Sequence, residues 1–379
     1  MATSQDQSVP PELGPYVLAW RALPLRDREV IEALVHPAHA SPSPELAHAL
    51  QRWDGHAYWS DEPGGRWLIL SRRRGAVRER WWLHIALFLL TLLTTTVAGS
   101  VLRGYLVLDD AWGLLRGRVT VIGDPVAALA TGLVFSLPLV AILLAHELGH
   151  YLVARRYQLD VSPPYFIPVP LWPSFIGTMG AFIRLRTILS DRRQLFDVGI
   201  AGPIAGFALA LPILWIGLRL SHPLPSLGGA GHGMILLIGG DRLWLGDSPV
   251  TLLTRLLVWG HRQPVVLHPL ALAGVLGMFV TMINMLPMAQ LDGGHLLYAA
   301  QPGWHQRVAL AFWIAILGLG YWWWGWYVWA GLVLALSRGR LDHPQVLVPE
   351  RPLPRARDWL IWVAVALFAL TFAPVPFRT

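Results

Sequence analysis

One segment constrains this chain more than any other: the apolar stretch Pro125–Ala154, which is long enough to cross a membrane as a helix. Ionisable side chains are costly inside a bilayer, so those that do occur there call for a functional reason. Three of them fall within the five residues His146–His150, which read H-E-L-G-H. The stretch therefore predicts a membrane-spanning helix that carries a functional site.

The composition of the whole chain agrees with a membrane protein. Hydrophobic residues make up 54% of the sequence and charged residues 14%, which favours a polytopic membrane protein over a soluble enzyme. The net charge of +7 comes from arginines that flank apolar segments, so we expect a lipid bilayer around the chain and no nucleic-acid partner. There is no cysteine, so a zinc site would have to use His, Asp or Glu.

The apolar segments predict the fold class. We expect an all-α polytopic membrane protein of about seven transmembrane helices, with a membrane-associated β-hairpin and a small N-terminal α+β cytoplasmic domain. Val308–Ser337 fits one long helix or a tight two-helix hairpin, and the arginines on both sides of it favour two helices. The predicted spans are Trp81–Val101, Pro125–Ala154, Asp197–Leu220, Val265–Pro287, two within Val308–Ser337, and Trp359–Phe372.

Four regions follow from this reading. They are a cytoplasmic domain (1–80), a first transmembrane helix with its outer loop (81–124), an intramembrane core (125–300) and C-terminal transmembrane helices (301–379). Within residues 1–80, the spacing of Leu25–Val35 predicts a helix, Ser43-Pro44 the start of another, and 56–71 a hairpin. This domain is either a docking or regulatory module or an anchor for the first span.

Two segments between the spans have other patterns. Phe175–Leu185 is apolar, extended and glycine-containing, which indicates a hairpin or re-entrant loop that must lie against protein or a wet cavity. Residues 221–264 are expected to form an outer loop. The small residues of Gly202–Gly206 are interpreted as a surface for close helix packing.

The chemistry of the H-E-L-G-H run points to a metal. Two histidines four residues apart lie on one face of a helix, where they can share a zinc ion, and Glu147 between them can accept a proton from a zinc-bound water. A hydrolytic zinc site needs a third protein ligand. Asp292 follows the fourth span on the same side of the membrane, and His295 is its competitor. Asp292-Gly293 is equally consistent with a turn, so residue chemistry alone leaves both readings open.

A family resemblance favours the ligand reading. H-E-L-G-H together with Asn284-x-x-Pro287-x-x-x-Leu291-Asp292-Gly293-Gly294-His295 resembles the site-2 protease family of intramembrane zinc metalloproteases, in a short form without PDZ or CBS domains. The segments 177–182 and 202–206 and the pair His343-Pro344 are similar to the same family. One difference is that Gly206 and Phe207 stand where some members carry an asparagine.

The resemblance implies one zinc ion per chain, held by His146, His150 and Asp292, with Glu147 as general acid and base. It implies an endopeptidase that cleaves the transmembrane helix of a single-span membrane protein. A helical substrate must partly unwind, and the hairpin containing Gly177 and Gly180 is a hypothetical partner for the unwound strand. Asn284 either hydrogen-bonds substrate or packs helices. The oligomeric state stays open.

Other functions would leave other marks. A membrane metalloprotease with a glutamate as third ligand is disfavoured, because no Glu lies between residue 148 and Glu350. A metal-binding transporter would not need Glu147. A non-catalytic, chaperone-like relative would not need the complete set of site residues. The arginines before Trp81 predict a cytoplasmic N-terminus. A bacterial inner membrane is the default expectation for the location, with an organelle membrane as the alternative.

Overall fold

The structure, a computed structural model, divides into two compact units. The first comprises Met1–Glu79, Ala154–Ser162 and Arg184–Ser190, and the second Arg80–Val153, Pro163–Ile183 and Asp191–Thr379. The structure describes residues 13–24, 28–41, 43–53, 55–62, 65–73, 79–108, 119–169, 176–186, 189, 191–224, 233–238, 241–260, 264–343, 346 and 351–378.

The first unit is built on a four-stranded antiparallel sheet in the order β1-β2-β4-β3. Helix α1 covers one face, and its Leu46 packs with Ile31, Leu68 and Leu70. The side chain of Ser43 accepts a hydrogen bond from the Leu46 N–H, as the Ser-Pro pair predicts. The elements are β1 (Val17–Pro24), β2 (Arg28–Val35), α1 (Pro44–Gln51), β3 (His56–Glu62) and β4 (Gly65–Arg73), with short 3-10 turns at Gly14–Tyr16 and Pro37–His39.

The helix predicted over Leu25–Val35 is wrong. Residues 25–27 lie outside the described residues, and the rest is strand β2 at the centre of the sheet. Ile31, Ala33 and Val35 are buried while the residues between them are half-buried, which is the period of a strand. Pairing with both β1 and β4 decides this structure, and a single segment cannot reveal it.

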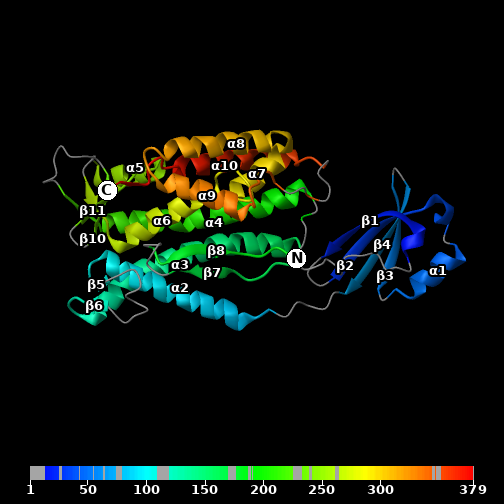
Figure 1. Cartoon of the computed structure of the whole chain (residues 1–379), viewed down its shortest axis with the longest axis horizontal. Helices are drawn as coiled ribbons and strands as arrows, with labels where there is room; N and C mark the ends of the chain where they lie inside the picture. Colours follow the sequence, from blue (N-terminus) through cyan, green and yellow to red (C-terminus); the bar gives the residue numbers. More distant parts are fainter. Residues whose placement is uncertain are drawn as a thin grey trace. The chain divides into compact units, whose positions relative to one another are not determined.

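Three helices of the second unit are long and apolar enough to cross a membrane: α2 (Trp81–Leu102), α3 (Pro125–Arg156) and α4 (Arg192–Arg219). Figure 1 shows them side by side. Leucines such as Leu89 and Leu93 point outward and are more than half exposed, as suits a surface in contact with lipid.

The other predicted spans correspond to shorter helices. These are α6 (Pro269–Asn284), α8 (Pro302–Leu319), α9 (Gly325–Leu336) and α10 (Asp358–Thr371), the last preceded by a 3-10 turn at Arg355–Arg357. Helix α7 (Asp292–Ala300) lies between the predicted spans. The segment Val308–Ser337 therefore holds parts of two helices, which is the alternative that the arginines favoured. The main core is formed where α3, α4 and α6 meet, around Phe135, Leu214 and Leu276.

The described part of the predicted outer loop forms regular structure. It contributes α5 (Pro249–Trp259) and three strands of a five-stranded sheet in the order β13-β11-β10-β12-β9. Strand β12 lies at the start of the predicted fourth span, and β13 pairs with β11. The strands are β9 (His222–Pro223), β10 (Met234–Ile238), β11 (Asp241–Leu245), β12 (Val265–Val266) and β13 (Phe377–Arg378).

Two small hairpins complete the second unit. One pairs β5 (Leu106–Leu108) with β6 (Val119–Val121), and the other pairs β7 (Tyr165–Pro168) with β8 (Thr178–Phe182). The segment Phe175–Leu185, predicted to form a hairpin by itself, contains only the second strand of this hairpin; the first strand lies upstream, and Phe175 is outside the described residues. The β7-β8 hairpin packs on α2, where the Thr94 hydroxyl donates to the Gly177 carbonyl at 2.7 Å.

Candidate metal centre

His146 and His150 lie one turn apart in the second half of α3, and both are buried. Their Nε2 atoms are 3.2 Å apart, and their ring centroids are 4.9 Å apart. The four-residue spacing of the sequence therefore places both imidazoles on one helix face, as expected.

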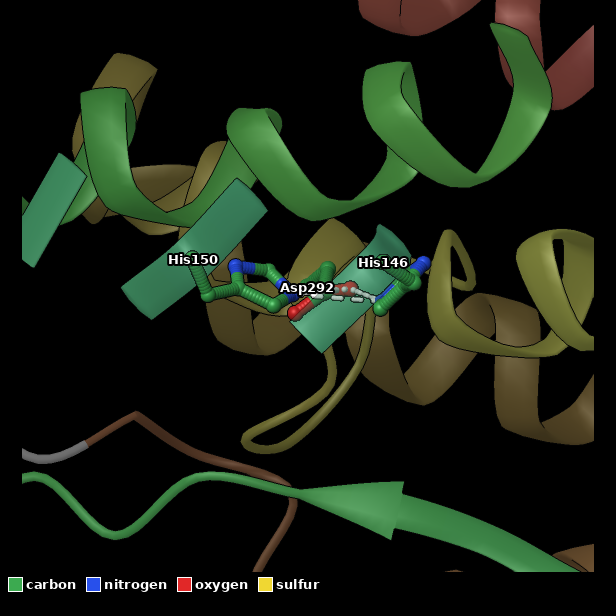
Figure 2. A group of neighbouring side chains, drawn as sticks. All are labelled: His146, His150 and Asp292. Atoms are coloured by element: carbon green, nitrogen blue, oxygen red, sulfur yellow. Dashed lines mark hydrogen bonds and ion pairs between the residues drawn. The ribbon is translucent and has the colours of Figure 1, made fainter. Parts of the chain in front are cut away.

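Asp292 brings a carboxylate to the same point from a different part of the chain. Its Oδ2 atom lies 3.1 Å from Nε2 of His146 and 3.3 Å from Nε2 of His150. Figure 2 shows the three side chains pointing toward one another. Asp292 is the first residue of α7, whose N-cap is Leu291 and has no side-chain cap. The carboxylate is therefore turned into the site instead of closing the helix end.

These donors have the spacing of a tetrahedral metal site. Ligand atoms at about 2.0–2.1 Å from a zinc ion lie about 3.3 Å from one another. The three distances here are 3.1, 3.2 and 3.3 Å. Among the described residues this is the one group of three His, Asp or Glu side chains whose donor atoms lie within 4.8 Å of one another. With one carboxylate, such a site would lower the charge of a bound zinc ion from +2 to +1, which eases its burial.

The orientation of His150 suits a metal ligand. Its Nδ1–H donates to the Val198 carbonyl oxygen at 2.7 Å, which leaves the Nε2 lone pair directed at the other donors. Nδ1 of His146 is buried and has no hydrogen-bond partner among the described residues. The two histidines are thus held differently, one by a hydrogen bond and the other by packing.

Two glycines of α4 make room for the imidazoles. A Cβ atom on Gly202 would lie 2.1 Å from Nε2 of His150, and one on Gly206 would lie 3.1 Å from Nδ1 of His146. From sequence, these glycines are interpreted as a surface for close helix packing and are not connected with the metal ligands. Their four-residue spacing, equal to that of the histidines, was the signal that could have linked them to the site.

Glu147 lies beside the three donors and outside their group. It is 6% exposed and directly follows His146 in helix α3.

The other residues predicted for the site lie in three places: beside the donor group, outside it, and in the hairpin. Asn284, the last residue of α6, places Nδ2 3.3 Å from Nε2 of His146, so it borders the donor group. His295 lies outside that group, because its Nδ1 is 2.6 Å from Nε2 of His343. Gly177 and Gly180 lie in the hairpin with φ angles of 84° and 100°. A Cβ on Gly177 would meet the Thr94 carbonyl oxygen at 2.5 Å, whereas one on Gly180 would meet no atom within 4 Å.

The matching family agrees with this geometry. Residues 134–312 match the model of peptidase family M50, and this segment contains both histidines, Glu147 and Asp292. The resemblance to site-2 proteases drawn from the two motifs is thereby confirmed.

Similar proteins carry metalloprotease names. The chain is 34% identical to the probable zinc metalloprotease EGY1, chloroplastic, of Arabidopsis thaliana over 246 residues, which are 62% of this chain and 41% of that protein. It is 30% identical to the probable zinc metalloprotease EGY2, chloroplastic, of Oryza sativa subsp. indica over 274 residues, 70% of this chain and 46% of that protein. The chain spans less than half of the length of these relatives. No solved structure matches it.

The relatives correct the predicted location. We expected a bacterial inner membrane, but these relatives are named as chloroplastic proteins of plants. The prediction was wrong because arginine-rich flanks distinguish the two sides of a membrane and carry no information about which membrane it is.

Proposed function

We propose that this chain is a zinc-dependent intramembrane endopeptidase that hydrolyses a peptide bond in or near the transmembrane helix of a single-span membrane protein. The observation that carries the proposal is the convergence of His146, His150 and Asp292 at tetrahedral ligand spacing, with Glu147 beside them. The position of both histidines on α3, a helix long and apolar enough to cross a membrane, supports cleavage inside the bilayer.

The residues divide the chemical work. One zinc ion, held by the two histidines and Asp292, would polarise a water molecule and the scissile carbonyl. The Glu147 carboxylate would accept the proton of the attacking water and deliver it to the leaving amine nitrogen.

Substrate would be held as an extended strand. The two-stranded sheet leaves one edge of β8 without a partner strand among the described residues. Main-chain hydrogen bonds to that edge would stabilise an unwound segment of a helix, in the manner of strand addition. Gly180 lies in this strand, and Asn284 would donate its amide to the substrate carbonyl from the other side.

The wider architecture of the proposal is a polytopic one. The four shorter apolar helices α6, α8, α9 and α10 would complete seven crossings together with α2, α3 and α4. Shorter helices can cross where the bilayer is thinned or where protein surrounds them.

A vesicle assay tests the function. Purified wild type and Glu147→Gln would be reconstituted with a single-span reporter protein that carries a Gly-Pro pair in its span. We expect cleavage within the span by wild type and a rate lower by at least about 100-fold in Glu147→Gln, since general-base catalysis contributes about 10²–10⁴-fold. Zinc content should be equal in the two proteins. Equal cleavage by both would refute the role of Glu147.

The same pair of proteins addresses the other function classes. Metal transport or storage would leave Glu147→Gln as active as wild type, because such a protein needs the metal donors and no proton acceptor. A chaperone-like relative would cleave the reporter in neither form. The control for both is Asp292→Ala, which should lose zinc and cleavage together.

A further inference from the structure

The helix that begins with Asp292 is poorly able to hold its own first turn. It is nine residues long, starts Asp292-Gly293-Gly294, and has no side-chain cap. Each glycine costs a helix about 1 kcal/mol relative to alanine, and a missing cap costs about as much again. A metal ligand on such a turn needs support from elsewhere in the fold.

Two kinds of contact supply that support. The glycines let the turn approach the preceding backbone, because a Cβ on Gly293 would lie 2.1 Å from the Met285 carbonyl oxygen. The second support comes from the segment after α9. The Leu341 carbonyl oxygen accepts a hydrogen bond from the N–H of Ala289. Ala289 is a buried residue with a φ of 49° in the turn that precedes α7.

The side chain of His343 adds a second hydrogen bond from the same segment. Its Nε2 lies 2.6 Å from Nδ1 of His295, one helical turn beyond Asp292. Residues three apart share a helix face, so a contact at His295 also fixes the rotation of the turn that carries Asp292. Burial lowers the pKa of the His295 imidazole to about 4, so this ring is uncharged at neutral pH and has one proton-donating and one accepting nitrogen.

Packing around His343 holds it in place. Its ring stacks on Tyr298, with centroids 4.5 Å apart and planes at 21°, and it is 9% exposed. His305 packs edge-on against it at 5.9 Å. These histidines are not among the donors of a three-ligand group in the described part of the chain, which argues against a second metal site of that kind.

We propose that His343 is a positioning residue for the metal ligand Asp292, and that it acts through its hydrogen bond to His295 on α7. The proposal rests on the proposed function, because it assumes that Asp292 binds the metal. It adds that a segment about 50 residues downstream of the ligand sets the metal affinity of the site. Partners of this kind behind a ligand typically contribute about 10–100-fold to metal affinity.

The test separates the hydrogen bond from the packing. In detergent-purified full-length protein, His343→Phe keeps the ring and loses the bond, whereas His343→Gln keeps a polar atom near Nε2 and loses the ring. Co²⁺ dissociation constants and the visible absorption of the bound Co²⁺ would be measured for both variants. His305→Phe is the matched control, since His305 belongs to the same buried cluster and makes no hydrogen bond to His295 in the described structure.

We expect Co²⁺ binding about 10–100-fold weaker in His343→Phe with altered visible bands, and constants within about 3-fold of wild type in His343→Gln and His305→Phe. Weak binding in His343→Gln with normal binding in His343→Phe would overturn the proposal in favour of packing. Normal binding in both, or a stoichiometry of two metals in wild type and one in the variants, would also overturn it. Wild type that binds no Co²⁺ would instead contradict the proposed function itself. If one His343 variant fails to fold, the other still decides between bond and packing.

Discussion

The substitution Gly202→Ala puts the geometry of the metal centre to its most demanding test. The new Cβ would lie 2.1 Å from Nε2 of His150 and 2.5 Å from the two neighbouring ring carbons. Ordinary van der Waals contacts begin at about 3.4 Å, so the His150 imidazole and helix α4 must move apart by about 1.3 Å. Helices α3 and α4 are in close contact here, because a Cβ on Gly149 would lie 2.4 Å from the Ala201 carbonyl oxygen. Moving the two helices apart would lose this packing.

The expected consequence is loss of metal binding with little loss of fold. Zinc sites tolerate deviations of about 0.2 Å in ligand distance, so a shift near 1 Å removes His150 as a ligand. The affinity for zinc should then fall by more than about 100-fold. Loss of a group that only hydrogen-bonds a ligand costs up to about 100-fold, and here a ligand itself is lost. Overpacking costs about 1–3 kcal/mol, and replacing a helical glycine returns about 1 kcal/mol, so the apo protein should lose at most about 2 kcal/mol.

The assay is zinc competition against a chromogenic chelator, with the Tm of the apo protein in the same detergent. Gly206→Ala should be milder, because its Cβ would lie 3.1 Å from the His146 ring and a few tenths of an ångström suffice. Gly331→Ala in α9 is the control, since nothing lies within 4 Å of its Cβ. Wild-type zinc affinity in Gly202→Ala would refute the placement of His150 against α4.

Two further predictions concern the hairpin and the outer sheet. Gly177→Ala should lower the Tm more than Gly180→Ala, because both have positive φ but only Gly177 meets the Thr94 carbonyl; equal Tm values would show that α2 does not hold the hairpin there. Asp247→Asn should lower the Tm strongly, because it removes the carboxylate that lies 2.6 Å from the fully buried Arg255. Removing one partner of a buried ion pair costs about 3–5 kcal/mol. An unchanged Tm would mean that this pair does not support the fold.

The main parts of the site could be predicted because their signals are local. The i, i+4 histidines fix their own geometry within one helix, and the length of the apolar segments follows from membrane thickness. The Asp292 motif could be recognised as a resemblance, although its chemistry alone left a turn as an alternative. The structure favours the ligand reading, because the Asp292 Oδ2 atom lies within 3.3 Å of the Nε2 atoms of both imidazoles.

Contacts between distant segments could not be predicted from one sequence. Gly202 and Gly206 have the composition of ordinary helix packing, and nothing in α4 states which helix face they meet. His343 lies 48 residues from His295, and their contact depends on how the segment after α9 returns to the core. The strand β2 and the two-residue strands of the outer sheet depend on pairing with remote partners, which periodicity within a segment does not contain.

Metal content tests the central claim most directly. Zinc per chain would be measured in detergent-purified wild type, Glu147→Gln, Asp292→Ala and His295→Ala. The account predicts about one zinc in wild type, Glu147→Gln and His295→Ala, and little in Asp292→Ala. Loss of zinc in His295→Ala with retention in Asp292→Ala, or no zinc in correctly folded wild type, would contradict it.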